Sequence, residues 1–279
     1  MKLLITTQII DANDPRLGFF VRWVEEFKKH CQVEVIALKD LGQGGKLARA
    51  WKLLGLVRRS EYETVFVHMN PEYLVVAGWY WRLRGKKIAL WYTHKNVDLK
   101  LRIAEKFAHI IFTASKESFR IKSNKVHVVG HGIDTDFFTP DPVVARGGWA
   151  LSVGRLTKSK RHDLAIRIAH EAGKELRIAG EGPEQSHLEA LASQLGARVV
   201  FLGGLNQTQL RDEYRRAAYF IHTSETGSLD KVVLEALACG LPVKTNDSAL
   251  KHLETAGPDY VREHHSLEKL IPKIIAVLS

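Results

Sequence analysis

The sequence predicts an α/β protein with two doubly wound domains, each built on a parallel sheet. Short apolar segments with strand character alternate with longer segments of helical periodicity along nearly the whole chain. Residues 139–148 break this alternation with two prolines and two glycines, so we expect the linker there. Parallel strands joined by helices are usually covered on both faces, and their ligands bind outside the carboxyl ends of the strands.

The elements of the first half follow directly from this alternation. Strands are predicted at residues 2–7, 32–38, 64–68, 87–92, 109–113 and 125–129, and helices at residues 17–30, 46–59, 72–84, 98–107 and 115–122. The second half is predicted to have strands at 149–153, from 176, at 198–202, 217–222 and 241–243, and helices at 162–172, 184–195, 207–215, 231–239, 251–256 and 267–278.

Composition restricts the class of protein. No apolar run approaches the roughly 20 residues that cross a bilayer, the first residues do not have the pattern of a signal peptide, and Cys31 and Cys239 provide no disulfide or zinc framework. We therefore expect a soluble cytoplasmic protein. The 41 Lys and Arg against 31 Asp and Glu favour an anionic partner, namely nucleic acid, anionic lipid or a phosphorylated small molecule. No common nucleic-acid motif occurs, so we expect no nucleic-acid partner.

Residues 223–243 are the most informative stretch. Turn-forming residues follow the predicted strand at 217–222, and Asp230 is a suitable N-cap for the helix at 231–239. The free amides of that helix start would point over the carboxyl end of the strand, where anions bind well. Within this helix Glu235 stands among apolar neighbours, residues 232–234 and 236–238. A buried carboxylate needs a partner, so Glu235 is either paired with a nearby Lys or Arg or part of a functional site.

Residues 235–243 (EALACGLPV) resemble the second half of the signature of retaining GT-B glycosyltransferases of family 4. That signature has a Glu, seven residues and a second Glu. Glu235 matches the second Glu, whereas Gly227 stands where the first is expected; Glu225 lies two positions too early and Asp230 three too late. The resemblance implies that Glu235 accepts hydrogen bonds from the ribose hydroxyls of a nucleotide-sugar. It also implies that the preceding loop and helix start contact the donor, through Gly227, Ser228, Leu229, Asp230 and Lys231.

Residues 154–160 (GRLTKSK) leave a predicted strand and lead into a helix. A guanidinium and an ammonium at a helix start suit phosphate recognition, although a solvated basic loop explains the same spacing. The segment resembles the Gly-Arg-Leu of the family, followed by a Lys five residues after the Arg, which implies that Gly154, Arg155 and Lys160 hold the donor diphosphate. Arg161 replaces the usual Gly. Residues 180–183 (GEGP) resemble another family segment, which adds Gly180 and Glu181 to the donor site.

Three places in the first half also matter. Gly18 opens a helix, either as a simple helix-start glycine or as a point where backbone approaches a ligand; family members usually carry glycine there. His94 follows an apolar strand and is either structural or, as the resemblance implies, in contact with the sugar or acceptor. Residues 128–138 resemble the family segment that ends the first domain, with His131 in place of the usual Asn.

Two basic stretches, residues 46–59 and 72–87, combine Lys and Arg with tryptophans. Each is either an ordinary helix with a solvated basic face or a surface that lies on an anionic membrane. Basic, aromatic first-domain surfaces are typical of relatives that act on lipid-linked acceptors.

Together these features predict two Rossmann-like domains of the GT-B type, facing a central cleft. The linker at 139–148 divides the chain into domains at residues 1–143 and 144–264, and the resemblance implies that the helix at about 265–279 packs back on the first. The predicted activity is transfer of a sugar, with retention, from a nucleotide-diphosphate sugar to a hydroxyl of a glycan or lipid-linked acceptor. His94, Arg155, Lys160 and Glu235 are the predicted catalytic residues; no paired-carboxylate metal site occurs, so we expect neither metal nor another cofactor. The alternatives are a non-catalytic GT-B scaffold that binds a nucleotide-sugar or a partner, and a sugar-nucleotide epimerase.

Overall fold

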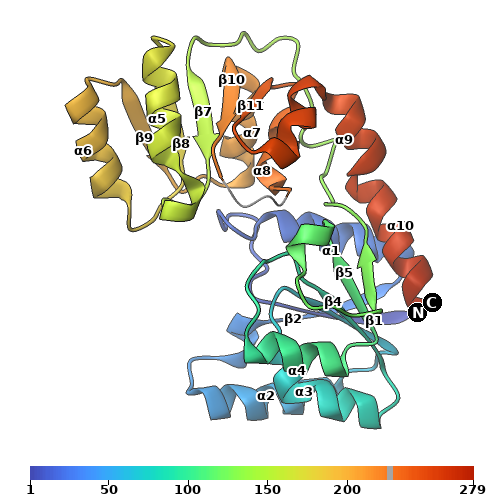
Figure 1. Cartoon of the computed structure of the whole chain (residues 1–279). Coiled ribbons are helices and arrows are strands. Elements are labelled where there is room, and N and C mark those ends of the chain that lie inside the picture. Colours follow the sequence, from blue (N-terminus) through green and yellow to red (C-terminus); the bar gives the residue numbers. More distant parts are fainter. Residues whose placement is uncertain (225–228) are drawn as a thin grey trace. The chain divides into compact units, whose positions relative to one another are not determined.

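The computed structural model describes residues 1–224 and 229–279, which form two compact units (Figure 1). The first unit comprises Met1–Gly132 and Leu267–Ser279, and the second Ile133–Ser266. The chain enters and leaves the second unit side by side, because Ile133 forms a parallel bridge with Ser266 and its amide donates to the carbonyl of His265 over 2.8 Å. The last helix therefore belongs to the first unit although it comes at the end of the chain.

The sheet of the first unit is entirely parallel, in the order β2-β1-β3-β4-β5-β6. Its strands are β1 (Lys2–Thr7), β2 (Gln32–Ala37), β3 (Thr64–His68), β4 (Lys87–Trp91), β5 (Ile110–Thr113) and β6 (Val126–Val128). Its helices are α1 (Phe19–His30), α2 (Lys46–Arg59), α3 (Glu72–Leu83), α4 (Leu99–Phe107) and α10 (Leu267–Leu278). The strand order reverses between β1 and β3, which is the topological switch point of this sheet.

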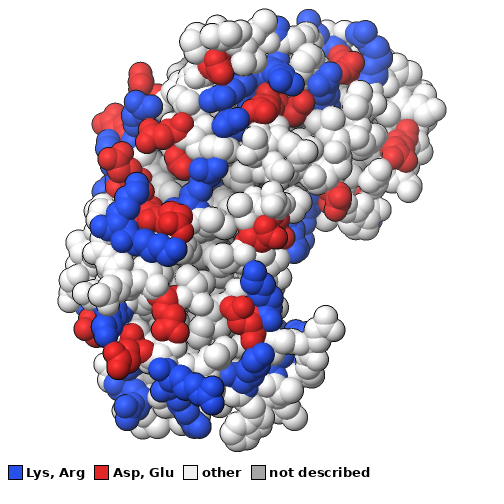
Figure 2. Space-filling view, turned by 180° about the vertical axis from the view of Figure 1, so that it is seen from behind, with Lys and Arg blue, Asp and Glu red and all other residues white. Residues whose placement is uncertain are grey.

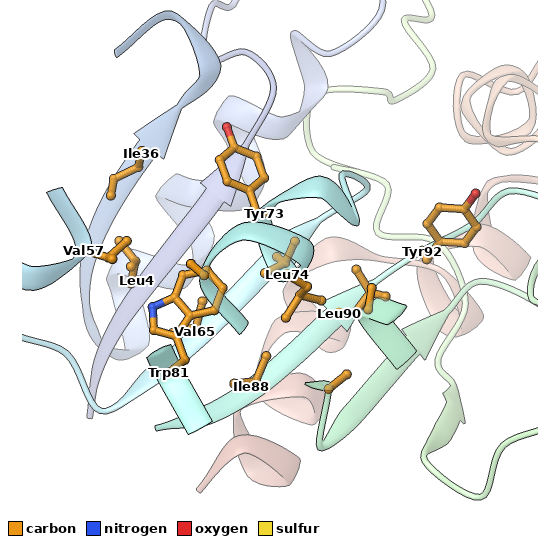
Figure 3. Packing of buried hydrophobic residues seen from close by; sticks show 14 of the residues in the cluster. Leu4, Ile36, Val57, Val65, Tyr73, Leu74, Trp81, Ile88, Leu90 and Tyr92 are labelled. Atoms are coloured by element: carbon orange, nitrogen blue, oxygen red, sulfur yellow. The ribbon is translucent and has the colours of Figure 1, made fainter. Parts of the chain in front are cut away.

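Successive side chains of β1 point to opposite faces of the sheet, and each face packs against helices. Leu3 and Ile5 pack in one core with residues of α1 and α10, and Leu4 points to the other core, built with α2, α3 and α4 (Figure 3). All three are essentially inaccessible to solvent. Burying such a side chain stabilises the fold by about 1.5–3 kcal/mol, so both faces of the strand hold it in register.

The second unit repeats the architecture with the strand order β11-β10-β7-β8-β9, again all parallel. Its strands are β7 (Ala150–Val153), β8 (Leu176–Ala179), β9 (Val199–Gly203), β10 (Tyr219–His222) and β11 (Val243–Thr245). Its helices are α5 (His162–Glu171), α6 (Gln185–Leu195), α7 (Gln207–Arg216), α8 (Lys231–Ala238) and α9 (Pro258–His264). Helices α5 and α6 pack on one face, and α7 and α8 on the other. The switch point lies between β7 and β10.

The division between the units comes earlier than the linker expected at residues 139–148. At Gly132 a Cβ would lie 2.8 Å from the side chains of Trp23, Leu267 and Leu270, so this glycine is packed into the first unit. The expected linker instead belongs to the second unit, where Arg146 donates to the carbonyls of Ala217 and Gly240 over 3.0 and 2.7 Å. Proline and glycine mark an irregular segment there, and side-chain hydrogen bonds fix it.

Three other segments differ from expectation. The helix predicted at residues 115–122 is wrong: only Lys116–Ser118 form a 3-10 turn, and the buried Phe119 is extended. Local hydroxyls compete with the helix there, since the side chains of Ser115 and Ser118 bond each other over 2.9 Å. Residues Ser248–Thr255 are 3-10 rather than α-helical. Helix α9, which was not predicted, begins at Pro258, a favourable first helical residue. None of the described helices has the length and apolar character needed to span a bilayer.

Candidate functional site

The loops that leave β7 and β10 meet at the switch point of the second unit. The hydroxyl of Thr223, just after β10, donates to the carbonyl of Lys160 over 3.0 Å. Beside it the hydroxyl of Ser224 reaches the carbonyl of Ser159 at 3.5 Å. These contacts hold the backbone of the Lys160 loop against the end of β10. Two segments more than sixty residues apart in sequence thus form one site.

Lys160 is the centre of a connected set of polar side chains. Its Nζ lies 2.5 Å from Oδ2 of Asp230, which also lies 3.1 Å from Nε2 of His222. The other ring nitrogen of His222 lies 3.1 Å from the hydroxyl of Thr245. Burial by itself would raise the pKa of Asp230, but the hydrogen bond with His222 and the charge of Lys160 outweigh it and hold that pKa well below its ordinary value. Asp230 is therefore a carboxylate at neutral pH.

Asp230 occupies the N-cap position of α8, as predicted, but its side chain does not cap the helix. Its carboxylate is used by Lys160 and His222 instead. The side chain at the N-cap therefore leaves the first turn of α8 without the usual capping hydrogen bond from that position. With Lys160 beside it, the positive end of the α8 dipole suits an anionic group.

Glu235 lies in the middle of α8 and is 1% exposed. Its Oε1 pairs with the ammonium of Lys231 one turn earlier, and its Oε2 accepts from the hydroxyl of Tyr214 over 3.3 Å. Burial and the neighbouring Glu235 charge both raise the pKa of Tyr214, which keeps the phenol protonated as a donor. The structure thus has the ion pair with a nearby Lys, one of the two alternatives for Glu235, and a ribose could reach this carboxylate only if Lys231 moved.

The glycines of the predicted donor site pack the strand ends together. A Cβ on Gly180, whose φ is +144°, would lie 1.9 Å from the carbonyl oxygen of Gly154, so only glycine allows the loops after β7 and β8 to touch. Glu181 follows, and its Oε1 accepts from the amide of Gly204 over 3.3 Å. Arg155 is exposed, and no described residue forms an ion pair or hydrogen bond with its guanidinium.

The remaining predicted donor residues, apart from Asp230 and Lys231, precede α8 in the sequence. Gly227 and Ser228 are outside the described residues, so their predicted contacts stay predictions. Leu229 is half-buried and packs against the core on the α7 and α8 face.

In the first unit the structure places Gly18 and His94 near the carboxyl ends of strands. A Cβ on Gly18 would lie 2.6 Å from the carbonyl of Asp14 and 2.7 Å from that of Ala12, so the loop itself requires this glycine. His94 is exposed after β4, and its Nδ1 accepts from the amide of Asn96 over 3.1 Å. His131 is largely buried. The ligand contacts predicted for Gly18 and His94 stay predictions.

Sequence reasoning missed several buried groups at the same sheet edges. His222 and Thr245 support Asp230, and His162 bonds the hydroxyl of Ser152 over 3.1 Å. Burial lowers the pKa of His162 to about 4. In the first unit His68 lies 3.1 Å from the hydroxyl of Thr7, and burial lowers its pKa to about 3. His68 and His222 could have been found, because each ends an apolar strand, as His94 nearly does.

No group of three or more His, Cys, Asp or Glu side chains within residues 1–224 and 229–279 is arranged to hold a metal ion. The independence from metal expected from the sequence stays a prediction.

Comparison with known proteins adds to this geometry. Residues 146–279 match the model of the family of group 1 glycosyl transferases. The chain is 35% identical over 137 residues to D-inositol 3-phosphate glycosyltransferase of Mycobacteroides abscessus, an alignment that covers 43% of this chain and 31% of that protein. It is 30% identical over 132 residues to the gpi3 subunit of phosphatidylinositol N-acetylglucosaminyltransferase of Schizosaccharomyces pombe, covering 44% and 29%. The chain thus matches less than a third of the length of these two relatives.

Solved structures resemble the whole chain. Anabaena Alr3699/HepE in complex with UDP superposes with a TM-score of 0.74 and 16% identity, covering 100% of this chain and 99% of that one. Sucrose-phosphate synthase of Thermosynechococcus elongatus gives 0.74 and 14%, with 99% and 98% covered. The predicted fold, two Rossmann-like parallel-sheet domains of the GT-B type, is thereby confirmed.

Proposed function

We propose that the protein transfers a sugar from a nucleotide-diphosphate sugar to a hydroxyl group of an acceptor. The observation that carries this proposal is the position of Lys160, whose ammonium lies beside Asp230, the N-cap residue of α8, at a topological switch point. The similarity of residues 146–279 to group 1 glycosyl transferases supports it. HepE, named above, was also solved in complex with UDP-glucose, which supports a nucleotide-sugar as the donor here.

The chemistry follows from the charge of the leaving group. The bond between the anomeric carbon and the diphosphate oxygen breaks, its electrons pass to the diphosphate, and the acceptor oxygen forms the new bond and gives up its proton. Negative charge therefore grows on the β-phosphate while the sugar becomes oxocarbenium-like. Lys160, Arg155 and the amides of α8 are the groups of this chain suited to stabilise that charge. Three such contributors lessen the need for a divalent cation, so we propose transfer without metal.

Lys160 has to exchange partners for this role. In the structure its ammonium is paired with Asp230, and a diphosphate would have to share it or replace the carboxylate. Glu235 is likewise paired, with Lys231. We propose that Glu235 accepts from the ribose once Lys231 turns toward the diphosphate, and that the reaction retains the configuration of the sugar, as the resemblance of residues 235–243 implies.

The test is the rate of sugar transfer in variants of the basic loop. A panel of nucleotide-sugars with glycan and lipid acceptors, analysed by mass spectrometry, identifies a substrate pair. Lys160→Ala and Arg155→Ala should then each lower kcat/KM by an amount equivalent to about 2–4 kcal/mol of transition-state stabilisation. Lys158→Ala is the matched control, since Lys158 is an exposed lysine in the same loop. Equal rates in Lys158→Ala, Lys160→Ala and Arg155→Ala would reject the proposed site.

A second function deserves the same assay. The internal ion pairs of Lys160 and Glu235 favour a GT-B scaffold that binds a nucleotide-sugar or partner without turnover. Such a protein would bind UDP in a Lys160-dependent way and release no transferred product with any acceptor. Release of product that needs no acceptor would instead indicate an epimerase or a hydrolase.

We propose a glycan or lipid-linked acceptor and a cytoplasmic protein that binds an anionic membrane peripherally. Leu47 and Trp51 on α2 are 80% and 71% exposed among basic residues, as a membrane contact requires, and both cysteines are free. On the face drawn in Figure 2, Lys and Arg are interspersed with Asp and Glu, an arrangement unlike a nucleic-acid surface. Trp51→Ala should lower co-sedimentation with vesicles containing phosphatidylserine; equal co-sedimentation of Trp51→Ala and the unaltered chain would exclude α2 as the contact.

A further inference from the structure

The first unit contains a pocket of about 460 Å³ at its own switch point. Gln8, just after β1, and Asn70, just after β3, line it, together with the first turns of α2 and α3. These two strands are the pair between which the strand order reverses, and open α/β sheets bind their ligands at that position. The volume is within the range of about 300–1,000 Å³ that small-molecule sites have.

The charges in the pocket favour an anion. Lys46, Arg49 and Lys100 line it with a single acidic residue, Glu72. The Nζ of Lys100 lies 2.7 Å from Oε1 of Glu72, so these two neutralise each other. Within the described residues, neither Lys46 nor Arg49 has a carboxylate within 4.0 Å, and the buried Nε of Arg49 has no hydrogen-bond acceptor. Two cations in excess, one with an unused buried donor, point to a missing anionic partner.

The start of α2 adds donors on the same side. Its N-cap, Gly45, has no side chain to offer, and its first turn contains no acidic residue. Lys46, Arg49, Ala50 and Leu53 follow the spacing of one helical face, and all four line the pocket. The first amides of this 14-residue helix and its dipole therefore favour negative charge where the two cations lie.

The rest of the lining is apolar. Leu38, Leu41 and Leu53 contribute to it together with Val75 and Val76 of α3. A small inorganic anion would leave this surface in contact with water, whereas a ligand with both an anionic and an apolar part would cover it.

We propose that this pocket binds a phosphate ester with an apolar substituent, with the phosphate at Arg49, Lys46 and the start of α2 and the substituent against Leu53 and α3. A guanidinium fork, an ammonium and helix amides match the three acceptor oxygens of a phosphate monoester. If the proposed transferase activity holds, this ligand is the acceptor; that assignment rests on the proposed function, whereas binding itself does not.

The test is calorimetric titration of the full chain with octyl phosphate, with octyl glucoside as the neutral probe. Arg49→Gln and Lys46→Gln should each weaken the binding of octyl phosphate about tenfold, as loss of a charge-assisted hydrogen bond does. Arg59→Gln is the matched control, because Arg59 is an exposed arginine in the last turn of the same helix. Ala50→Leu fills the pocket without changing charge and should abolish binding of the probe, and circular dichroism verifies that each variant is folded.

The same variants separate the outcomes. Binding to vesicles of phosphatidylcholine and phosphatidic acid that depends on Arg49 would identify the ester as a lipid, and Arg49-dependent binding of octyl phosphate without vesicle binding would identify a soluble ester. Equal affinities in Arg49→Gln and Arg59→Gln, or equal affinities for octyl phosphate and octyl glucoside, would overturn the proposal. UDP binding, measured in parallel, should be unchanged in Arg49→Gln, so failure of the donor site in the second unit remains a separate result.

Discussion

At the switch point of the second unit Lys160 lies 2.5 Å from Asp230, whereas at that of the first unit Lys46 and Arg49 line an open pocket with no carboxylate partner among the described residues. Both positions are the carboxyl edge of a parallel sheet where the strand order reverses. The same edge of the same kind of fold therefore carries its positive charge in two different ways.

The two switch points should differ in what an anionic ligand has to displace when it binds. A paired lysine is already held in position, so it loses little side-chain entropy on binding, but the ligand has to compete with the carboxylate. An arginine such as Arg49, without a carboxylate partner in the described part of the chain, presents no competitor to an incoming ligand. The paired site suits a ligand whose charge increases during reaction, and the unpaired site suits one whose charge stays constant.

Low pH should destabilise both units, because each has a buried histidine near the edge of its sheet. This loss of stability is the largest effect we expect. Burial lowers the pKa of His68 to about 3 and that of His162 to about 4, from an ordinary value of 6.5. Between the folded-state pKa and 6.5, each histidine binds a proton only in the unfolded chain. The contribution of these two groups to the free energy of unfolding is therefore fully present above pH 6.5 and falls as the pH decreases. At about 1.4 kcal/mol per pH unit for each group, the two histidines together should lower the free energy of unfolding by about 4 kcal/mol at pH 5.

Urea unfolding between pH 7 and pH 5 measures this slope. His68→Asn should make the curve shallower by about 1.4 kcal/mol per pH unit, because the unfolded state no longer gains that proton. His187→Asn is the control, since His187 is exposed. Identical slopes in His68→Asn and His187→Asn would show that folding does not lower the pKa of His68.

Removing the cation of the buried pair in α8 should be the next largest effect. Lys231→Met leaves Glu235, which is 1% exposed, with Tyr214 as its remaining partner among the described residues, and should lower the free energy of unfolding by about 3 kcal/mol. Lys174→Met, at an exposed lysine, should change it by less than about 0.5 kcal/mol. Equal losses in the two variants would contradict a structural ion pair.

The double variant Lys231→Met/Glu235→Leu distinguishes structure from ligand binding. It removes both charges of the pair and leaves no unpaired buried carboxylate at position 235, so it should be more stable than Lys231→Met alone. If Glu235 also binds the ribose, the double variant should bind UDP less well than the unaltered protein despite its recovered stability.

Strong local patterns made much of the fold predictable. β1, α2 and β3 begin and end at the predicted residues, because apolar periodicity and polar boundaries agree in each. The helix predicted at residues 115–122 does not form, because these two kinds of signal disagree there. The side chains of Ser115 and Ser118 bond each other, and no apolar stripe compensates. Periodicity also could not locate the division at Gly132, which depends on contacts with Leu267 and Leu270 at the far end of the chain.

Individual residues of the site could be predicted from the sequence, but the contacts between them could not. Gly154, Arg155, Lys160 and Asp230 stood out because each lies at a strand end or a helix start. Their partners did not, since Lys160 and Asp230 are separated by 70 residues and meet only through the strand order of the second sheet. The pocket of the first unit was invisible for the same reason: Arg49 and Asn70 belong to different helix–strand units, and no local pattern indicates that they line one cavity.

The smallest effect concerns the pairing of Lys160 itself. Asp230→Asn removes one negative charge beside the ammonium while keeping the hydrogen-bonding shape of the side chain, so Lys160 no longer has to exchange partners when a diphosphate binds. A charge about 5 Å from the diphosphate, at an effective dielectric constant between that of water and that of a protein surface, is worth about 1 kcal/mol, or roughly fivefold in affinity. Calorimetry at pH 7 should therefore show UDP binding more tightly to Asp230→Asn than to the unaltered chain, and Lys160→Gln should bind it more weakly. Weaker binding of UDP to Asp230→Asn would mean that the carboxylate orients Lys160 for the diphosphate. The two switch points would then differ because the second unit orients its cation, not because the carboxylate competes with the ligand.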